Sequence, residues 1–115
     1  MNNKQKQIKK LEKREDNRKL KEWAKAVKER DGDKCVICDK TEKLNAHHII
    51  PREVKEFRYL VINGITLCQS HHKFSLQISP HRNPFVFFID FLKNRPGQFI
   101  ALYNKYLEYL RESLK

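Results

Sequence analysis

Two pairs of potential metal ligands, separated by twenty-nine residues, constrain this 115-residue chain more than any other feature. Two residues separate Cys35 from Cys38, and two separate Cys68 from His71. This spacing lets both side chains of a pair turn toward one ion, so two pairs complete a tetrahedral Zn²⁺ site of three thiolates and one imidazole. A chain this short buries a small core, and a structural metal is a common remedy. We therefore expect a structural zinc site that staples the two regions together.

Two alternatives remain open for these ligands. Cys35 and Cys38 can instead form a redox pair, with Cys68 a buried apolar residue. His72 competes with His71 for the fourth position, although the symmetry with the first pair favours His71. The cysteine count is three, which excludes a complete internal disulfide framework.

The N-terminal sequence is polar and basic, without a hydrophobic signal segment or a run that crosses a bilayer. We therefore expect a cytoplasmic protein with reduced thiols and no membrane partner. The net charge is +11, and residues 1–30 hold twelve Lys/Arg against five Asp/Glu. A polyanion, most commonly nucleic acid, is the natural partner of such a surface, and a merely solvated surface is the alternative. We predict a basic helical arm over 1–19 whose DNA-binding cations include Lys9, Lys10, Lys13, Arg14, Arg18 and Lys19.

Periodicity predicts a helix over 3–30 in two parts, a charged first part and a second part with an apolar stripe that includes Trp23 and Val27. Gly32 is expected to end it. The next predicted elements are a turn with the first cysteine pair, a strand over 44–50 ended by Pro51, a turn at Asn63-Gly64 and a short strand over 65–67.

Two helices are expected in the C-terminal third. Asn83-Pro84 is a good helix start, and Phe85, Phe88, Ile89 and Leu92 are expected to form one face of the helix. Pro96-Gly97 should separate it from a last helix, whose apolar stripe is listed here: Phe99, Leu102, Tyr103, Tyr106, Leu107, Leu110 and Leu114. We favour core packing for this aromatic stripe, and a dimer face or a base-stacking surface is the alternative.

The strand LNAHHII holds two adjacent histidines, His47 and His48, which are costly to bury unless they bind something. On a regular strand they point to opposite faces, so they serve one site only if the strand bends or ends there. Otherwise one is buried and the other exposed. Fourteen residues separate His48 from Asn63, and eight separate Asn63 from His72.

With its "VKERDGDKCVIC", "AHHIIP" and "NGITLC" segments and the closing His-His, the stretch from about Trp23 to about Phe74 resembles the HNH nuclease family, also called ββα-metal or His-Me finger nucleases. Members with this zinc site usually have a cysteine where His71 stands, and Zn²⁺ accepts either ligand. The resemblance implies a metal-dependent endonuclease that cuts DNA and leaves a 5′-phosphate and a 3′-hydroxyl, of a kind often found in phages or mobile elements and so in a bacterial or phage-infected cell.

The resemblance also implies roles for the remaining residues. His47 and His72 would hold the catalytic cation, which can be Mg²⁺, Mn²⁺, Ni²⁺ or Zn²⁺, and His48 would be the general base. Asn63 either orients the loop that carries the base or ligates the metal. These roles suit phosphodiester hydrolysis, which needs a base for water and a cation for the phosphate.

Three further residues are weaker candidates: Arg58 and Arg52 for the scissile phosphate, and His81 as an extra ligand. Each is otherwise a loop or surface residue.

The pattern of elements predicts an α+β protein, and the resemblance implies a small zinc-stapled ββα-metal nuclease core with an N-terminal basic helix and two C-terminal helices. We expect one HNH domain over 20–115, with a core at 23–78 and a helical pair at 83–114. It would act on double-stranded DNA as a monomer or weak homodimer. The alternatives are a non-catalytic zinc-binding DNA module and a zinc-stapled protein-interaction domain.

Overall fold

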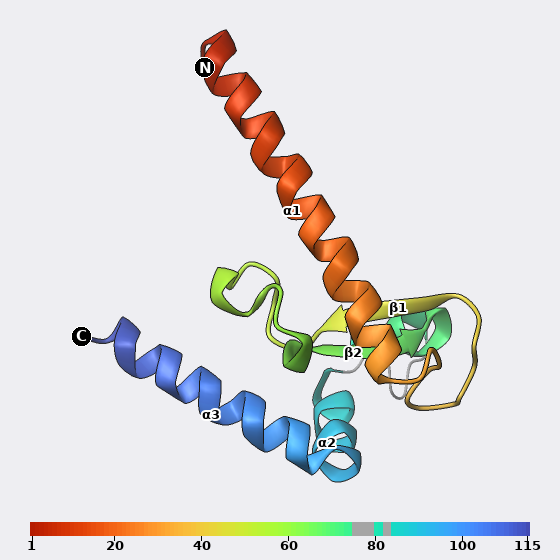
Figure 1. Ribbon diagram of the computed structural model, residues 1–115. Coiled ribbons are helices and arrows are strands. Elements are labelled where there is room, and N and C mark those ends of the chain that lie inside the picture. The colour runs from red at the N-terminus through yellow and green to blue at the C-terminus, as the bar shows by residue number, and fades with distance from the viewer. Residues whose placement is uncertain (75–79, 82–83) are drawn as a thin grey trace.

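A two-stranded antiparallel sheet lies at the centre of an α+β fold (Figure 1). The computed structural model describes residues 1–74, 80–81 and 84–115. Strand β1 (Leu44–His48) pairs with strand β2 (Gly64–Cys68) in a register that places Leu44 opposite Cys68 and His48 opposite Gly64. The two predicted strands are confirmed, although β1 ends at His48, three residues before Pro51. The pairing brings the end of the His-His strand beside the start of β2.

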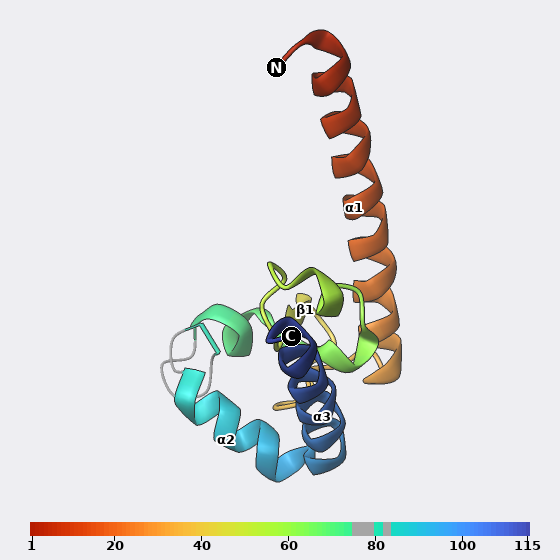
Figure 2. The same ribbon diagram turned by 90° about the vertical axis from the view of Figure 1, so that its left-hand side faces the viewer.

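Helix α1 (Asn3–Arg30) confirms the predicted bounds as one continuous helix of 28 residues. Asn2 caps its start. The helix ends at Arg30 with Asp31 as its C-cap, and the next residue, Gly32, has a φ of 73° in the left-handed region that glycine tolerates. The last turns of α1 pack on the sheet, and its N-terminal half projects away from the rest of the molecule (Figures 1 and 2).

The close packing of α1 on the sheet depends on Gly64. A Cβ atom at this position would lie 2.4 Å from Val27 Cγ2 and 2.8 Å from Trp23 Cζ2, so only glycine fits without a shift of the helix. The predicted turn at Asn63-Gly64 lies slightly earlier in the chain than expected. Asn63 instead ends a short 3₁₀ helix, η2 (Val61–Asn63), and Gly64 has an extended φ of −126°. Close approach of two elements, rather than turn geometry, explains this glycine.

The buried carboxylate of Asp31 ties three elements together. It accepts hydrogen bonds from the Thr66 backbone N–H at 2.9 Å and from Arg30 at 2.8 Å, and it pairs with Arg95 at 2.9 Å. Burial opposes its ionisation, but these donors outweigh that effect and lower its pKa. The carboxylate therefore fixes the C-terminal end of α1 and Arg95, the residue before the last helix, on strand β2.

Helix α2 (Pro84–Asn94) presents a different face to the core from the one predicted. Phe87 and Phe91 are 7% and 2% exposed, whereas Phe88 and Leu92 are 48% and 40% exposed. The predicted face is wrong because so many positions of α2 are apolar that docking against the sheet, and not periodicity, selects the buried side. The predicted cap Asn83 and the side chain of Phe85 lie outside the described part of the chain.

Helix α3 (Pro96–Ser113) begins at the predicted Pro96 break. Its stripe is core for only part of its length: Leu102 is 4% exposed, while Tyr103, Leu110 and Leu114 are 52%, 37% and 87% exposed. Along the described ranges of the chain, helices long and apolar enough to cross a membrane are absent.

Candidate functional site

Three cysteines and one histidine form the first cluster of metal-binding side chains. Cys35 and Cys38 lie in the turn after α1, and Cys68 is the last residue of β2. His71 lies in the short π-helix η3 (Ser70–Phe74). His71 Nδ1 lies 3.3 Å from Cys68 Sγ and 3.7 Å from Cys35 Sγ, and the Cys38 and Cys68 sulfurs are 3.7 Å apart. Ligands about 2.1 to 2.3 Å from a tetrahedral ion have comparable separations. The four predicted ligands come together and can hold a metal ion such as zinc.

Backbone hydrogen bonds shape the turn that holds the first pair. The Asp39 N–H donates to the Cys35 carbonyl at 2.9 Å, and the Cys35 N–H donates to the Lys40 carbonyl at 2.8 Å. Burial acts to raise the pKa of the Cys68 thiol, but hydrogen bonds from the His71 backbone and from neighbouring thiols outweigh it and lower the pKa. A lowered pKa favours the thiolate, which is the form that binds metal.

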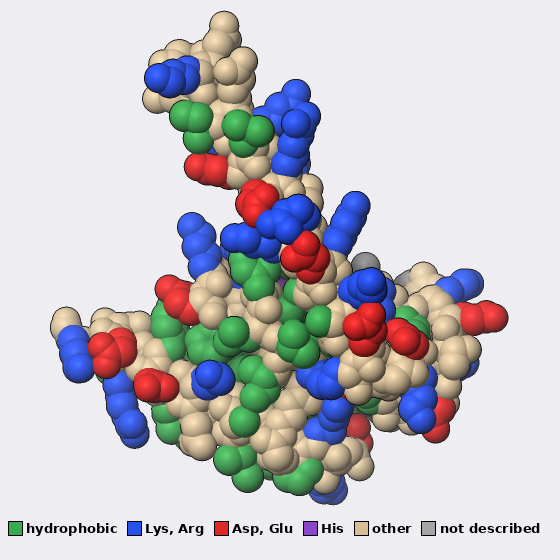
Figure 3. Space-filling view, viewed as in Figure 1, with side chains coloured by type: hydrophobic (Ala, Val, Ile, Leu, Met, Phe, Trp, Pro, Cys, Tyr) green, Lys and Arg blue, Asp and Glu red, His purple; other side chains and the backbone are tan. Residues whose placement is uncertain are grey.

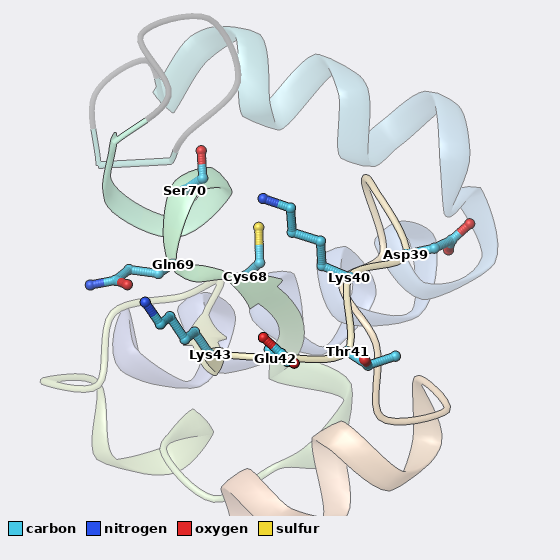
Figure 4. A pocket seen from close by; sticks show the side chains of 8 residues that line it. All are labelled: Asp39, Lys40, Thr41, Glu42, Lys43, Cys68, Gln69 and Ser70. Carbon is cyan, nitrogen blue, oxygen red and sulfur yellow. The ribbon is translucent and has the colours of Figure 1, made fainter.

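A cavity of about 570 Å³ opens beside this cluster, and Figure 4 shows the side chains around it. The cavity is lined by Cys68, Gln69 and Ser70 and, from the loop before β1, by Asp39, Lys40, Thr41, Glu42 and Lys43. None of the predicted catalytic residues lines this cavity. It therefore adjoins the cysteine cluster and not the histidines of the second site.

Three histidines form the second cluster. His72 Nε2 lies 3.2 Å from His47 Nδ1 and 2.9 Å from His81 Nε2, and one ligand atom from each residue lies within 4.8 Å of the others. Nitrogens that bind one ion at about 2.1 Å have such separations. His47 and His72 come together as predicted. His81, the weaker candidate, joins them although it is nine residues beyond His72 and has no recognisable ligand spacing.

The protonation state of His47 suits metal binding. Burial, and after it the charges of His72, His81 and His48, lower its pKa to about 3. The imidazole is therefore neutral at pH 7, and a nitrogen lone pair is available to a cation.

His48 has a different set of neighbours. Its ring stacks on Trp23 of α1 with centroids 3.8 Å apart and planes 9° apart, and its Nε2 lies 2.9 Å from the Arg58 carbonyl oxygen. A carbonyl only accepts, so Nε2 carries the proton and Nδ1 keeps its lone pair. Burial lowers the pKa of His48, against the opposing effect of that hydrogen bond. A neutral imidazole with a fixed tautomer is suited to accept a proton at Nδ1.

His47 and His48 nevertheless line one cavity of about 630 Å³. Adjacent residues of a regular strand point to opposite faces, so the two histidines can serve one site only if the strand bends or ends at the pair. Strand β1 does end at His48.

Asn63 is fully buried and holds the loop between the two strands. Its side-chain oxygen accepts from the Ile50 N–H at 2.6 Å, and its nitrogen donates to the carbonyls of Ile50 and Phe57 at 2.9 and 3.0 Å. Two roles were open for Asn63, orienting the loop or ligating the metal. These contacts fit the first role, because the same loop carries the Arg58 carbonyl that contacts His48.

The two candidate phosphate-binding arginines are placed differently. Arg58 turns toward α1, where Nη1 lies 3.1 Å from Asp16 Oδ1, and its Nε donates to the Arg52 carbonyl at 2.8 Å. Tyr59 also donates to Asp16. Arg52, in contrast, is exposed and lines the cavity that His47, His48, His72 and His81 share, called the histidine cavity below.

The predicted basic arm carries most of its cations on an exposed helix surface (Figure 3). Arg18 pairs with Glu15 and with Glu22, and Lys19 Nζ lies 5.5 Å from the centre of the Tyr59 ring. Within the described ranges, ion pairs with carboxylates are absent for the remaining four candidates, which are Lys9, Lys10, Lys13 and Arg14.

Comparisons of the chain with protein-family models, with curated proteins and with solved structures found no match. The features that bear on function are therefore the geometry of the two clusters and the order of their residues in the chain.

Proposed function

We propose that this protein is a metal-dependent endonuclease of the HNH type that hydrolyses DNA phosphodiester bonds. Support comes above all from one juxtaposition: a histidine cluster that can hold a cation shares a cavity with His48, whose Nδ1 keeps its lone pair. Hydrolysis of a phosphodiester needs these two functions close together. The order of Cys35, Cys38, His47, His48, Asn63 and Cys68 in the chain, which resembles the family, agrees with this assignment.

His47, His72 and His81 would hold one divalent cation. Three imidazole ligands suit Ni²⁺ or Zn²⁺ better than Mg²⁺, and all four metals, Mn²⁺ included, are tested below. When bound, the cation would neutralise charge on the phosphate and assist the leaving 3′-oxygen.

The chain's own residues would do the rest. His48 Nδ1 takes a proton from water, and the Arg58 carbonyl stabilises the imidazolium that results, because Nε2–H already donates to it. Trp23 holds the plane of the ring. Arg52, on the wall of the cavity, can donate to a phosphate oxygen.

The cysteine cluster would hold a structural Zn²⁺. Its four ligands come from the turn after α1 and from the β2–η3 junction, so the ion would staple those two regions beside the histidine cavity. The basic arm would bind the phosphates of double-stranded DNA, with the protein as a monomer or a weak homodimer.

Supercoiled plasmid is the test substrate. The purified protein is incubated with plasmid and Mg²⁺, Mn²⁺, Ni²⁺ or Zn²⁺, and nicked and linear products are separated on a gel. We expect cleavage by the parent, little cleavage by His48→Ala, and cleavage by His47→Ala only at higher metal concentration. Tight DNA binding without cleavage in any of the four metals would identify a non-catalytic zinc-binding module instead.

A further inference from the structure

Some residues that line the histidine cavity have no role in the proposed chemistry. Besides the histidine side chains, three rings of α2 line the cavity and form its aromatic wall: Phe87, Phe88 and Phe91. The volume of about 630 Å³ lies within the range of small-molecule binding sites and far exceeds what one hydrated phosphate requires. The cavity therefore has room for more of the substrate than the group that reacts.

The aromatic wall begins directly beside the candidate metal ligands. The Phe87 ring meets the His47 ring edge-to-face, with centroids 5.8 Å apart. Phe87 and Phe91 are almost fully buried and belong to the core. Phe88 differs, because it is 48% exposed while its ring rests on Phe99 with centroids 5.2 Å apart. Core packing explains the first two rings but not the exposed surface of Phe88.

The Phe88 ring lies on the lining of the histidine cavity, and this position limits which part of a nucleic acid can contact it. In a nucleic acid whose phosphate lies at the histidine cluster, the nearest apolar surface is a base of an adjoining nucleotide. A phenyl face binds any base by stacking, and such a contact contributes about 1–3 kcal/mol per base. In an intact duplex both faces of each base are already stacked, and freeing one costs a few kcal/mol. Stacking on Phe88 is therefore favourable only for a base that is already unpaired.

We propose that the aromatic wall led by Phe88 binds an unstacked nucleobase beside the scissile phosphate, so that the preferred substrate is DNA with unpaired nucleotides at the cleavage position. This inference rests on the proposed endonuclease function. It also fits the exposed basic arm, which would hold the flanking duplex while the cavity takes the unpaired nucleotide. Arg52, on the cavity wall, supplies a cation for the phosphate of that nucleotide.

Binding is tested first, without added divalent metal, so that the result does not depend on cleavage. The probe is a short single-stranded DNA with a central 2-aminopurine, whose fluorescence falls when the base stacks. We expect the parent protein to quench it. Phe88→Leu, which keeps an apolar side chain but lacks a ring, should raise the dissociation constant about tenfold and remove the quenching. Phe88→Tyr, which keeps a ring, should retain the parent's affinity and quenching. Leu92→Ala is the matched control, since Leu92 is an exposed apolar residue of the same helix outside the cavity.

Cleavage is tested on two labelled duplexes that differ only in a central bubble of unpaired nucleotides. We expect kcat/KM to be about tenfold higher for the bubble, and Phe88→Leu to remove most of that preference. Equal cleavage of both duplexes with no effect of Phe88→Leu would overturn the inference and leave the endonuclease function intact. Quenching that depends on Phe88 without cleavage of either duplex would instead reject the endonuclease function and retain the base-binding cavity. Unchanged quenching in Phe88→Leu would overturn the inference whatever the cleavage result.

Discussion

The indole of Trp23 lies flat on the imidazole of His48, with ring centroids 3.8 Å apart, and its Nε1–H donates to the Leu60 carbonyl at 2.7 Å. One side chain of α1 therefore contacts both the proposed general base and the loop whose Arg58 carbonyl sets the tautomer of that base. Gly64 makes this possible, because any larger residue there would hold the helix away from the sheet.

Replacement of Trp23 should separate positioning from stability. Trp23→Phe keeps a stacking ring but loses the hydrogen bond to Leu60 and some buried ring volume, so we expect kcat to fall a few-fold. Trp23→Leu loses the stack as well, and kcat should fall by at least about tenfold with little change in KM. Steady-state cleavage and thermal melting are measured on both variants. Equal kcat values for the two would argue against a positioning role for the ring.

The cysteine cluster should contribute folding energy. Cys35→Ser is expected to release one zinc ion per chain and to lower the melting temperature strongly, because binding free energy at such a site is folding free energy. Metal analysis and calorimetry measure the two effects. His72→Ala is the control and should retain this zinc, since His72 belongs to the other cluster. A Cys35→Ser protein with the parent's melting temperature would refute the structural role.

The histidines should divide the work of the second site. His48→Ala should keep metal and DNA binding but lose cleavage by a factor on the order of 10²–10⁴, as expected on removal of a positioned base. His47→Ala, His72→Ala and His81→Ala should instead weaken the binding of the catalytic metal, measured as the metal concentration for half-maximal cleavage. Cleavage by His48→Ala at the parent's rate, with full metal affinity in His47→Ala, would reverse the assignment.

The lowered pKa of His47 predicts a pH-dependent stability. The unfolded chain, in which a histidine has a pKa near 6.5, takes up a proton here as the pH falls, whereas the folded protein, with a pKa of about 3, does not. Stability should therefore fall from pH 7.5 to 5.5, by about 1 kcal/mol from this residue. Urea unfolding without added divalent metal compares the parent with His47→Gln. The same pH dependence in both proteins would contradict the prediction.

The exposed cations of the arm should bind phosphates. Simultaneous Lys9→Gln, Lys10→Gln and Lys13→Gln substitutions leave the helix and the Asp16–Arg58 contact in place. Each phosphate contact adds roughly 0.9 to the slope of log affinity against log salt, so the slope should flatten by up to about 2.7 units. The cleavage rate at saturating DNA and low salt should be nearly unchanged. Binding titrations at several salt concentrations measure the slope, and a solvated arm without a binding role would leave it unaltered.

Several elements could be predicted from local sequence patterns alone. The bounds of α1, the two strands, the break at Pro96 and the grouping of Cys35 and Cys38 with Cys68 and His71 are of this kind. The helix bounds, the strands and the break depend on periodicity and on capping and turn residues, which act between near neighbours in the chain. The two-residue spacing within each ligand pair is also local, and the four ligands that one tetrahedral ion requires group the two pairs. The endonuclease activity and the arm boundary at residue 19 stay predictions.

Other features depend on contacts between distant segments. In α2, where most positions are apolar, only docking on the sheet selects Phe87 and Phe91 for the core and leaves Phe88 exposed. His81 joins His47 and His72 because the chain returns to them, with no spacing to announce it. Asn63 holds the loop, and Arg58 turns to Asp16 on α1. The sequence by itself therefore determined which residue types could act as ligands. Tertiary packing decided that His81 is the third member of the histidine cluster and that Phe88 is exposed beside it. The reason is that packing depends on separations in space, which residue spacing does not encode.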